Sequence, residues 1–172
     1  MLAATDGASQ VLMRAQAVDA ANSRQVKAEF IVSFLSFVDW PATKTGAPQG
    51  QLLVAILGDP DFAELVRRAA THRPVAGRSV VVQEVPNPEG ARDAHLAFIG
   101  SSEAKRLPAI LRSLATQPVL TVGDTDGFAH EGVAINLYTF DKRIRIEVNT
   151  TAAERAGLRL SSNLLRLARI VQ

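Results

Sequence analysis

The sequence has 172 residues, of which 47% are hydrophobic and 21% are charged, and its formal net charge is +2 at pH 7. These values are ordinary for one globular domain, and the dispersed basic residues exclude the clustered basic face that nucleic-acid binding requires. The chain contains no cysteine, which excludes disulfides, thiol catalysis, thiolate zinc sites and iron–sulfur clusters.

Residues 1–22 are rich in alanine and weakly patterned, and we expect an N-terminal tail or a loosely packed helix there. Its few large apolar residues, together with one alanine, fit one face of a short helix: Val11, Leu12, Ala15 and Val18. The segment lacks the basic start and apolar core of an intact signal peptide. Residues 23–172 are expected to form a single domain.

Residues 24–40 carry the strongest apolar pattern in the chain and the only tryptophan. Val26, Phe30, Phe34 and Phe37 recur at helical spacing, which predicts an amphipathic helix of about four turns ended by Pro41. Three further residues in or beside this helix have two interpretations each. Ile31 and Leu35 widen the apolar stripe, as core or as interface, and Trp40 is either an anchor on the core or a partner contact.

Short apolar runs then alternate with helical segments, which predicts a mostly parallel sheet with helices on both faces. Strands are expected at residues 51–57, 79–85, 95–99 and 119–122, and helices at 60–71 and 103–115. A β-hairpin with one buried face is expected over residues 133–148. A capping box at 151–154 and a C-terminal helix from Ser162 follow. The predicted fold is an α/β protein with five to six strands, ending in the hairpin and that helix.

Three of the predicted strands end in similar polar loops, Gly58-Asp59, Gly100-Ser101-Ser102 and Gly123-Asp124. Ligands of open α/β sheets bind beyond the carboxyl ends of the strands. The candidate ligand or partner edge therefore consists of Asp59, Phe62, Ser101, Ser102 and Asp124. The alternative is that these turns simply need glycine and a capping carboxylate. No metal site or cofactor is expected, and Asp124 to Gly127 fits an ordinary turn.

In its order of motifs the chain resembles the YfiR family of bacterial periplasmic proteins, from about Gln25 to Val171. The most specific part is Val26-Lys-Ala-x-Phe30 followed by Phe34 and Phe37-Val-Asp-Trp-Pro41. Supporting stretches are Leu57-Gly-Asp59 with Phe62, Gly77-Arg78, residues 95–99, 118–124, Gly127-Phe128, Gly132, Ile135-Asn136, 146–149 and 161–165.

This resemblance implies an exported α/β protein, its signal peptide removed, that has no enzymatic activity and needs no cofactor. It also implies a dimer, and a partner in the membrane: the periplasmic part of a diguanylate cyclase, which the family's best-known member represses. The chain departs from many relatives in carrying Ala94 where they have a cysteine, and Val32-Ser33 where a Tyr-Asn pair is common. Disulfide-based redox control, as in some relatives, cannot operate here.

Two functions are therefore expected from the sequence. The first is a periplasmic regulator of a membrane signalling protein, the cyclase in particular. The second is a small-molecule-binding module that uses the carboxyl edge of the sheet. A hydrolase or transferase ranks last, because the sequence contains no phosphate-binding loop, nucleophile elbow or zinc-protease motif.

Overall fold

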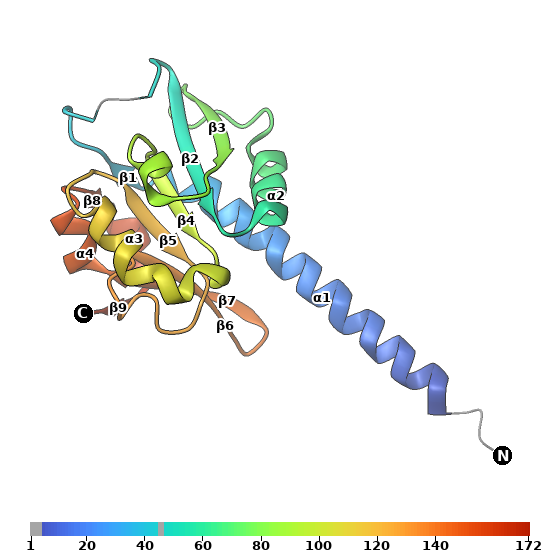
Figure 1. Ribbon diagram of the computed structural model, residues 1–172. Helices are drawn as coiled ribbons and strands as arrows, with labels where there is room; N and C mark the ends of the chain where they lie inside the picture. Colours follow the sequence, from blue (N-terminus) through green and yellow to red (C-terminus); the bar gives the residue numbers. More distant parts are fainter. Residues whose placement is uncertain (1–4, 45–46) are drawn as a thin grey trace.

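The computed structural model describes residues 5–44 and 47–172 and has an α/β architecture (Figure 1). Its main sheet has seven strands in the order β3-β2-β4-β5-β6-β7-β9, and neighbouring strands run parallel except in the β6–β7 hairpin. The strands are β2 (Gln51–Leu57), β3 (Ser79–Glu84), β4 (Leu96–Ile99), β5 (Leu120–Gly123), β6 (Ile135–Phe140), β7 (Arg143–Asn149) and β9 (Arg169–Val171). The prediction of a mostly parallel α/β sheet is confirmed, with more strands than expected.

Helices cover both faces of this sheet, as predicted. α1 (Thr5–Phe34), α2 (Pro60–Ala70) and α5 (Ser162–Leu167) supply buried side chains to the core on one face. The short 3₁₀ helix η1 (Pro88–Ala91) and α3 (Leu107–Leu114) enclose a second core on the other face. Successive crossovers to opposite faces place the switch in strand order between β2 and β4.

The Phe-rich helix ends at Phe34, about one and a half turns before the predicted end near Pro41. Near this end, Ser33 Oγ donates a hydrogen bond to the Glu29 carbonyl, and Ser36 Oγ donates one to the Ser33 carbonyl. Serine hydroxyls thus occupy backbone carbonyls at the end of the helix. The chain then enters β1 (Val38–Asp39), which pairs antiparallel with β8 (Arg159–Leu160). This pairing joins segments about 120 residues apart, so local sequence could not indicate it.

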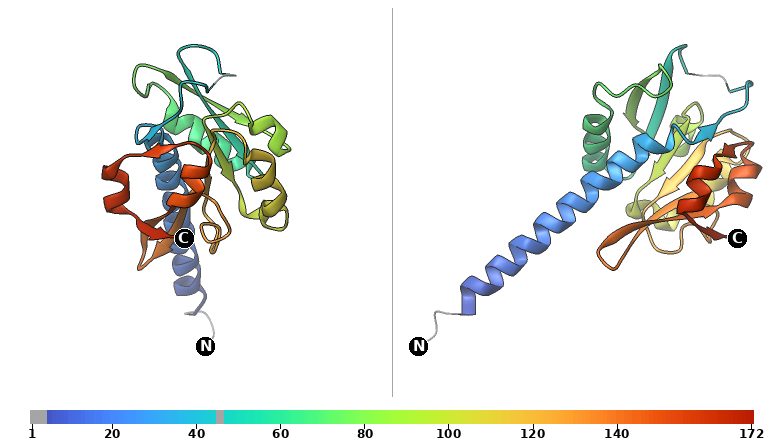
Figure 2. Two further views of the ribbon diagram at one scale, coloured as in Figure 1. Left: turned by 90° about the vertical axis from the view of Figure 1, so that its left-hand side faces the viewer. Right: turned by 180° about the vertical axis from the view of Figure 1, so that it is seen from behind.

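The expected tail or short helix within residues 1–22 is helical from Thr5 and continuous with the Phe-rich segment, and residues 1–4 lie outside the described residues. Figure 1 and Figure 2 show the first half of α1 extending away from the sheet, while its second half crosses the domain beside α2. The division of the chain at residue 22 stays a prediction. In the described residues, no helix combines the length and the apolar character needed to cross a membrane.

The C-terminal region differs most from expectation. α5 is only six residues long, and the chain continues as β9, which pairs in parallel with β7. Leu167 and Ile170, which the predicted C-terminal helix would include, are 73% and 46% exposed. The β-branched residues Ile170 and Val171 suit a strand, and β7 offers them an unpaired edge.

The hairpin is present, but its buried part is not limited to one face. Asn136, Glu147 and Asn149 are buried on its other face. The loop before β6 lies there, because Asn136 and Asn149 donate hydrogen bonds to the Thr125 and Ala129 carbonyls. The predicted capping box is also wrong. Helix α4 (Thr150–Arg155) begins two residues earlier, and its N-cap is Asn149 in place of Thr151; Asn149 Oδ1 accepts the Ala152 N–H at 2.9 Å.

Candidate functional site at the carboxyl edge of the sheet

Asp59 lies directly after β2 and holds two elements together. Its carboxylate caps α2 by accepting the Phe62 N–H at 3.0 Å, which is the N-cap that the sequence predicts. The same carboxylate accepts two hydrogen bonds from Arg24 Nη2 on α1, at 2.9 and 3.1 Å. Because Asp59 accepts these hydrogen bonds, the pKa of the Arg24 guanidinium is raised above its ordinary value. The charge that would attract a cationic ligand is thus already paired within the chain.

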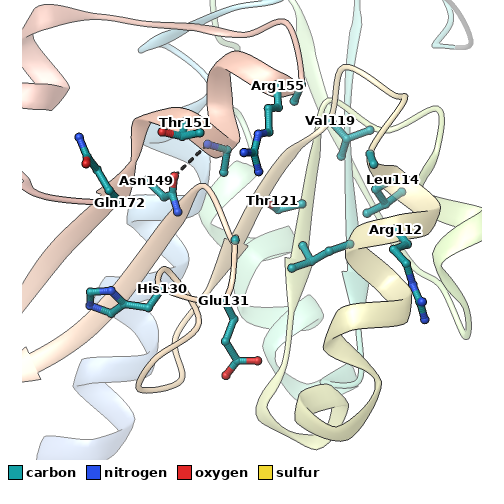
Figure 3. A pocket seen from close by; sticks show the side chains of 15 residues that line it. Arg112, Leu114, Val119, Thr121, His130, Glu131, Asn149, Thr151, Arg155 and Gln172 are labelled. Atoms are coloured by element: carbon teal, nitrogen blue, oxygen red, sulfur yellow. Dashed lines mark hydrogen bonds between the residues drawn. The ribbon is translucent and has the colours of Figure 1, made fainter.

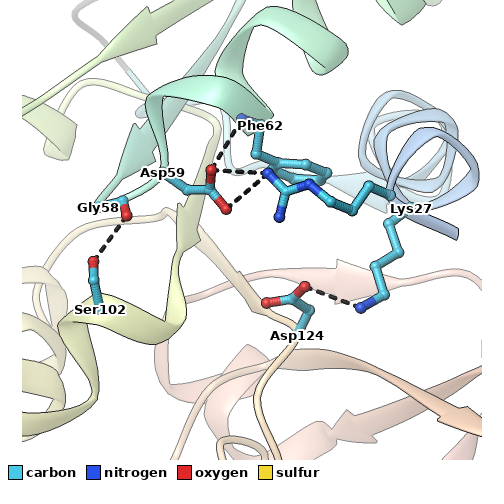
Figure 4. Close-up of polar contacts among 7 residues, drawn as sticks. Lys27, Gly58, Asp59, Phe62, Ser102 and Asp124 are labelled. Carbon is cyan, nitrogen blue, oxygen red and sulfur yellow. Dashed lines mark hydrogen bonds and ion pairs between the residues drawn. The ribbon is translucent and has the colours of Figure 1, made fainter. Parts of the chain in front are cut away.

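Asp124, at the end of β5, is paired by the same helix. Lys27 Nζ lies 3.0 Å from Asp124 Oδ2, and the two side chains are only 13% and 18% exposed. Arg24 and Lys27 are three positions apart, so one face of α1 presents both cations to the edge of the sheet. Figure 4 shows Lys27 reaching down from the helix to Asp124, beside the contacts of Asp59.

Phe62 lies beneath the Arg24–Asp59 ion pair and belongs to the core. Its side chain is 1% exposed, and its ring centroid lies 4.4 Å from that of Phe98 on β4. The Arg24 guanidinium carbon lies 5.4 Å from the centroid of the Phe62 ring, a cation–π arrangement. Phe62 therefore supports Arg24 from below and is not accessible to a ligand.

The crevice at the switch in strand order is closed by direct packing. Ser102 Oγ donates a hydrogen bond of 2.8 Å to the Gly58 carbonyl. A Cβ added at Gly58 would lie 2.4 Å from Ser102 Oγ, and one added at Gly100 would lie 3.0 Å from the Leu57 carbonyl. Ser101 is exposed in the first turn of the following 3₁₀ helix, η2 (Ser101–Arg106). The two loops are therefore in direct contact at this point.

The structure therefore places Asp59, Phe62 and Asp124 against α1, whereas Ser102 joins the neighbouring loop to Gly58. Sequence reasoning had missed the two residues that complete the arrangement, Arg24 and Lys27. Their partners lie 35 and 97 positions away, so spacing carried no signal for either pair. The amphipathic pattern indicated only that this helix would pack on the sheet.

The three residues proposed as interface or anchor lie around the second half of α1. Ile31 is 0% exposed and Leu35 is 3% exposed, so both are covered by their own chain. Trp40 is half-buried, and its indole N–H donates a hydrogen bond of 3.0 Å to the His95 carbonyl. Its ring also meets the His95 imidazole edge-on, with centroids 5.2 Å apart. These contacts are those of a local anchor.

A cavity of about 820 Å³ lies between α3, α4 and the loop before β6, away from the carboxyl edge (Figure 3). Two of its buried polar side chains already serve the backbone: Thr121 Oγ1 accepts the Ala134 N–H, and Asn149 Nδ2 donates to the Ala129 carbonyl. None of the residues that line this cavity was proposed from the sequence as a site residue. Thr121 and Asn149 thus hold the loop before β6 in place, and both already have hydrogen-bond partners within the chain.

Taken together, the sheet and its closed edge define an α/β domain whose ligand edge is occupied by its own first helix. A profile of the YfiR/HmsC-like family matches residues 24–169. The chain belongs to this YfiR/HmsC-like family.

Two solved structures share the fold at low sequence identity. A conserved domain protein from Vibrio cholerae is 13% identical, with a TM-score of 0.61 over 84% of this chain. An ABC domain from Streptococcus, solved in complex with L-Trp, is 10% identical, with a TM-score of 0.52 over 70% of this chain. The chain spans 60% and 55% of the lengths of these two proteins. At such identities the likeness concerns the fold alone.

Proposed function

We propose that this protein is a non-catalytic periplasmic regulator that binds and represses a membrane signalling partner, and that this partner is a diguanylate cyclase. The observation that carries the proposal is the family match over residues 24–169. By repressing the cyclase, the protein would lower cyclic di-GMP and restrain biofilm formation.

The chemistry of the carboxyl edge supports a non-catalytic role. A general acid or base must reach its substrate with a free ionisable group. Asp59 and Asp124 are instead bound to Arg24 and Lys27, and Asp59 also caps a helix. The edge that serves many α/β enzymes as an active site is here a packing surface.

The proposed mechanism is repression by occupancy. The protein, as a monomer or a homodimer, binds the periplasmic sensor part of the cyclase and holds it inactive until an envelope signal releases it. Since the sequence has no cysteine, that signal must act without a disulfide in this chain.

Deleting the gene tests the cyclase proposal. Cyclic di-GMP and biofilm mass should rise in the deletion strain and return to the starting level when the gene is restored. A second deletion that also removes the partner cyclase should abolish the rise. Unchanged cyclic di-GMP in the single deletion would contradict repression of a cyclase.

Photo-crosslinking identifies the partner independently of cyclic di-GMP. Phe140 at the tip of the β6–β7 hairpin and Leu167 are 66% and 73% exposed, so a photoreactive residue at either position should leave the fold intact. Exposed Glu64 on α2 is the control position on another surface. A membrane protein captured from one apolar position and not from Glu64 would support a membrane partner, and no capture from either would oppose it.

A further inference from the structure

The opposite edge of the sheet, at the amino ends of β2, β3 and β4, holds a cavity of about 400 Å³. Three basic side chains line it: Lys44, Arg78 and His95. Its other walls are largely apolar, formed by Leu35, Val38, Leu52, Val75 and one side of Trp40. A volume in this range fits a small organic molecule rather than a bare ion.

The imidazole of His95 is placed between two hydrogen-bond donors. The Leu53 backbone N–H donates to Nδ1 at 3.1 Å, and Arg78 Nη2 lies 3.1 Å from Nε2. A neutral imidazole has only one acceptor nitrogen, so either tautomer leaves one donor facing another donor. A protonated ring would leave two such contacts.

The cost of an unpaired backbone amide decides between the two tautomers. Leu53 belongs to a strand paired on both sides, and its amide hydrogen is satisfied by His95 Nδ1. The ring proton therefore lies on Nε2, beside the guanidinium of Arg78. His95 is only 3% exposed, so this N–H has little access to bulk water. The Nε2–H of His95 therefore faces Arg78 Nη2, a second donor, which is bonded to the Gln51 carbonyl.

The charge of the cavity points the same way. In the described part of the chain, neither Arg78 nor Lys44 has a carboxylate within ion-pairing distance. Burial lowers the pKa of Lys44 to about 8, although Asp93 opposes that shift. Burial and the charges of Arg78 and Lys44 lower the pKa of His95 to about 4. Asp39, which is exposed, is the one carboxylate among the described lining residues.

A tight turn holds Arg78 at the cavity wall. Val75 and Arg78 exchange two backbone hydrogen bonds of 2.9 Å, around Ala76 and Gly77. Ala76 has a φ of +49°, in a region that residues with a Cβ seldom adopt. Arg78 Nη2 also donates to the Gln51 carbonyl at 2.7 Å, which fixes the guanidinium in place.

We propose that this cavity binds a small organic acid, whose carboxylate accepts hydrogen bonds from Arg78 Nη2 and His95 Nε2 near the ammonium group of Lys44. The apolar body of the acid packs against Trp40 and the aliphatic walls. This ligand site lies at the amino edge of the sheet, away from the carboxyl edge that the sequence indicated. The proposal is independent of the regulatory role, because it concerns binding to the isolated chain.

Calorimetry with benzoate, acetate and inorganic phosphate tests the site on the full chain. We expect saturable one-to-one binding of benzoate, weaker binding of acetate, and weaker binding of phosphate than of benzoate. Arg78→Gln and Lys44→Gln should each weaken benzoate binding about tenfold or more, because each removes a charged partner of the carboxylate. Arg73→Gln is the matched control: Arg73 pairs with Glu29 outside the cavity, so affinity should not change.

NMR of the His95 imidazole in the unmodified chain guards against misfolding of the Arg78 variant. Benzoate should shift the His95 resonances at the concentrations that saturate calorimetry, while the resonances of His72 stay in place. The proposal is overturned if benzoate does not saturate by about 10 mM, a weak limit for specific ligands. Binding that survives Arg78→Gln and Lys44→Gln, or phosphate binding tighter than benzoate, would also overturn it.

Discussion

Arg24 on α1 and Asp59 at the start of α2 are joined by two hydrogen bonds across 35 positions of the chain. Asp59 thereby has two roles, as helix cap and as the partner of a cation on another helix. The two roles can be separated by mutation.

Replacing Asp59 should destabilise the domain more than replacing Arg24. Asp59→Ala removes a helix cap, at about 1 kcal/mol, and the ion pair as well. Arg24→Gln leaves the cap in place and removes the pair and the cation–π contact with Phe62. Because the Arg24 side chain is 39% exposed, we expect a loss below about 1 kcal/mol. Urea denaturation measures both. Equal losses for the two variants would show that the cap contributes nothing.

Two glycines with the same backbone conformation provide a matched test of the closed crevice. Gly58 has φ +74° and Gly50 has φ +79°, but only the Cβ of an alanine at 58 would meet other atoms, at 2.4 Å from Ser102 Oγ. Gly50→Ala should cost about 1 kcal/mol of backbone strain. Gly58→Ala should cost about 2 kcal/mol more, from the enforced shift of the η2 loop.

Thermal or urea unfolding of the two alanine variants gives the difference directly. If Gly58→Ala were no more destabilising than Gly50→Ala, the two loops would be able to separate at little cost. The crevice would then be open to a small ligand after all.

The stability of the domain should fall as the solution is acidified from about pH 6.5 to about pH 4. The pKa of His95 is about 4 in the folded chain, below the ordinary value of 6.5. In this window the unfolded chain binds a proton that the folded chain does not, so acid favours unfolding. The charged groups that act on His95 are Arg78 and Lys44. Denaturation curves at several pH values should show a loss of up to about 3 kcal/mol, much of it absent in His95→Gln.

Truncation tests the proposed start of the domain at residue 23. A chain of residues 23–172 keeps Arg24, Lys27 and the buried part of α1, so its unfolding midpoint should match that of the full chain. A chain of residues 29–172 loses both cations together with Ala28, which is fully buried, and should unfold at a clearly lower urea concentration. A destabilised 23–172 chain would place the first turns of α1 within the folding unit.

Local sequence signals predicted the parts of the fold that depend on local physics. The buried strand 51–57 and the Asp59 cap both follow from adjacent residues. The end of α1 and the strand at 169–171 depend instead on backbone partners far along the chain, β8 and β7. The apolar pattern continued beyond Phe34 and through residues 169–171, so it predicted helix where the chain forms strands that pair with β8 and β7.

The position of the candidate edge was predictable from the sequence, but the pairing of its carboxylates was not. The glycines and aspartates that follow the predicted strands identified which loops would meet, because parallel strands align their carboxyl ends. It could not indicate that Arg24 and Lys27 would neutralise Asp59 and Asp124. The basic cavity was missed for the same reason, since His95, Arg78 and Lys44 are distant in sequence and come together only through the turn at 75–78 and the amino ends of the strands.

Trp40 gives the protein an optical reporter of its own. It is the only tryptophan in the sequence, and its indole contacts His95 at the wall of the basic cavity. All tryptophan emission of the chain therefore comes from one known position. A molecule entering the cavity would alter that emission without any label, so chemical libraries can be screened by fluorescence on the unmodified chain.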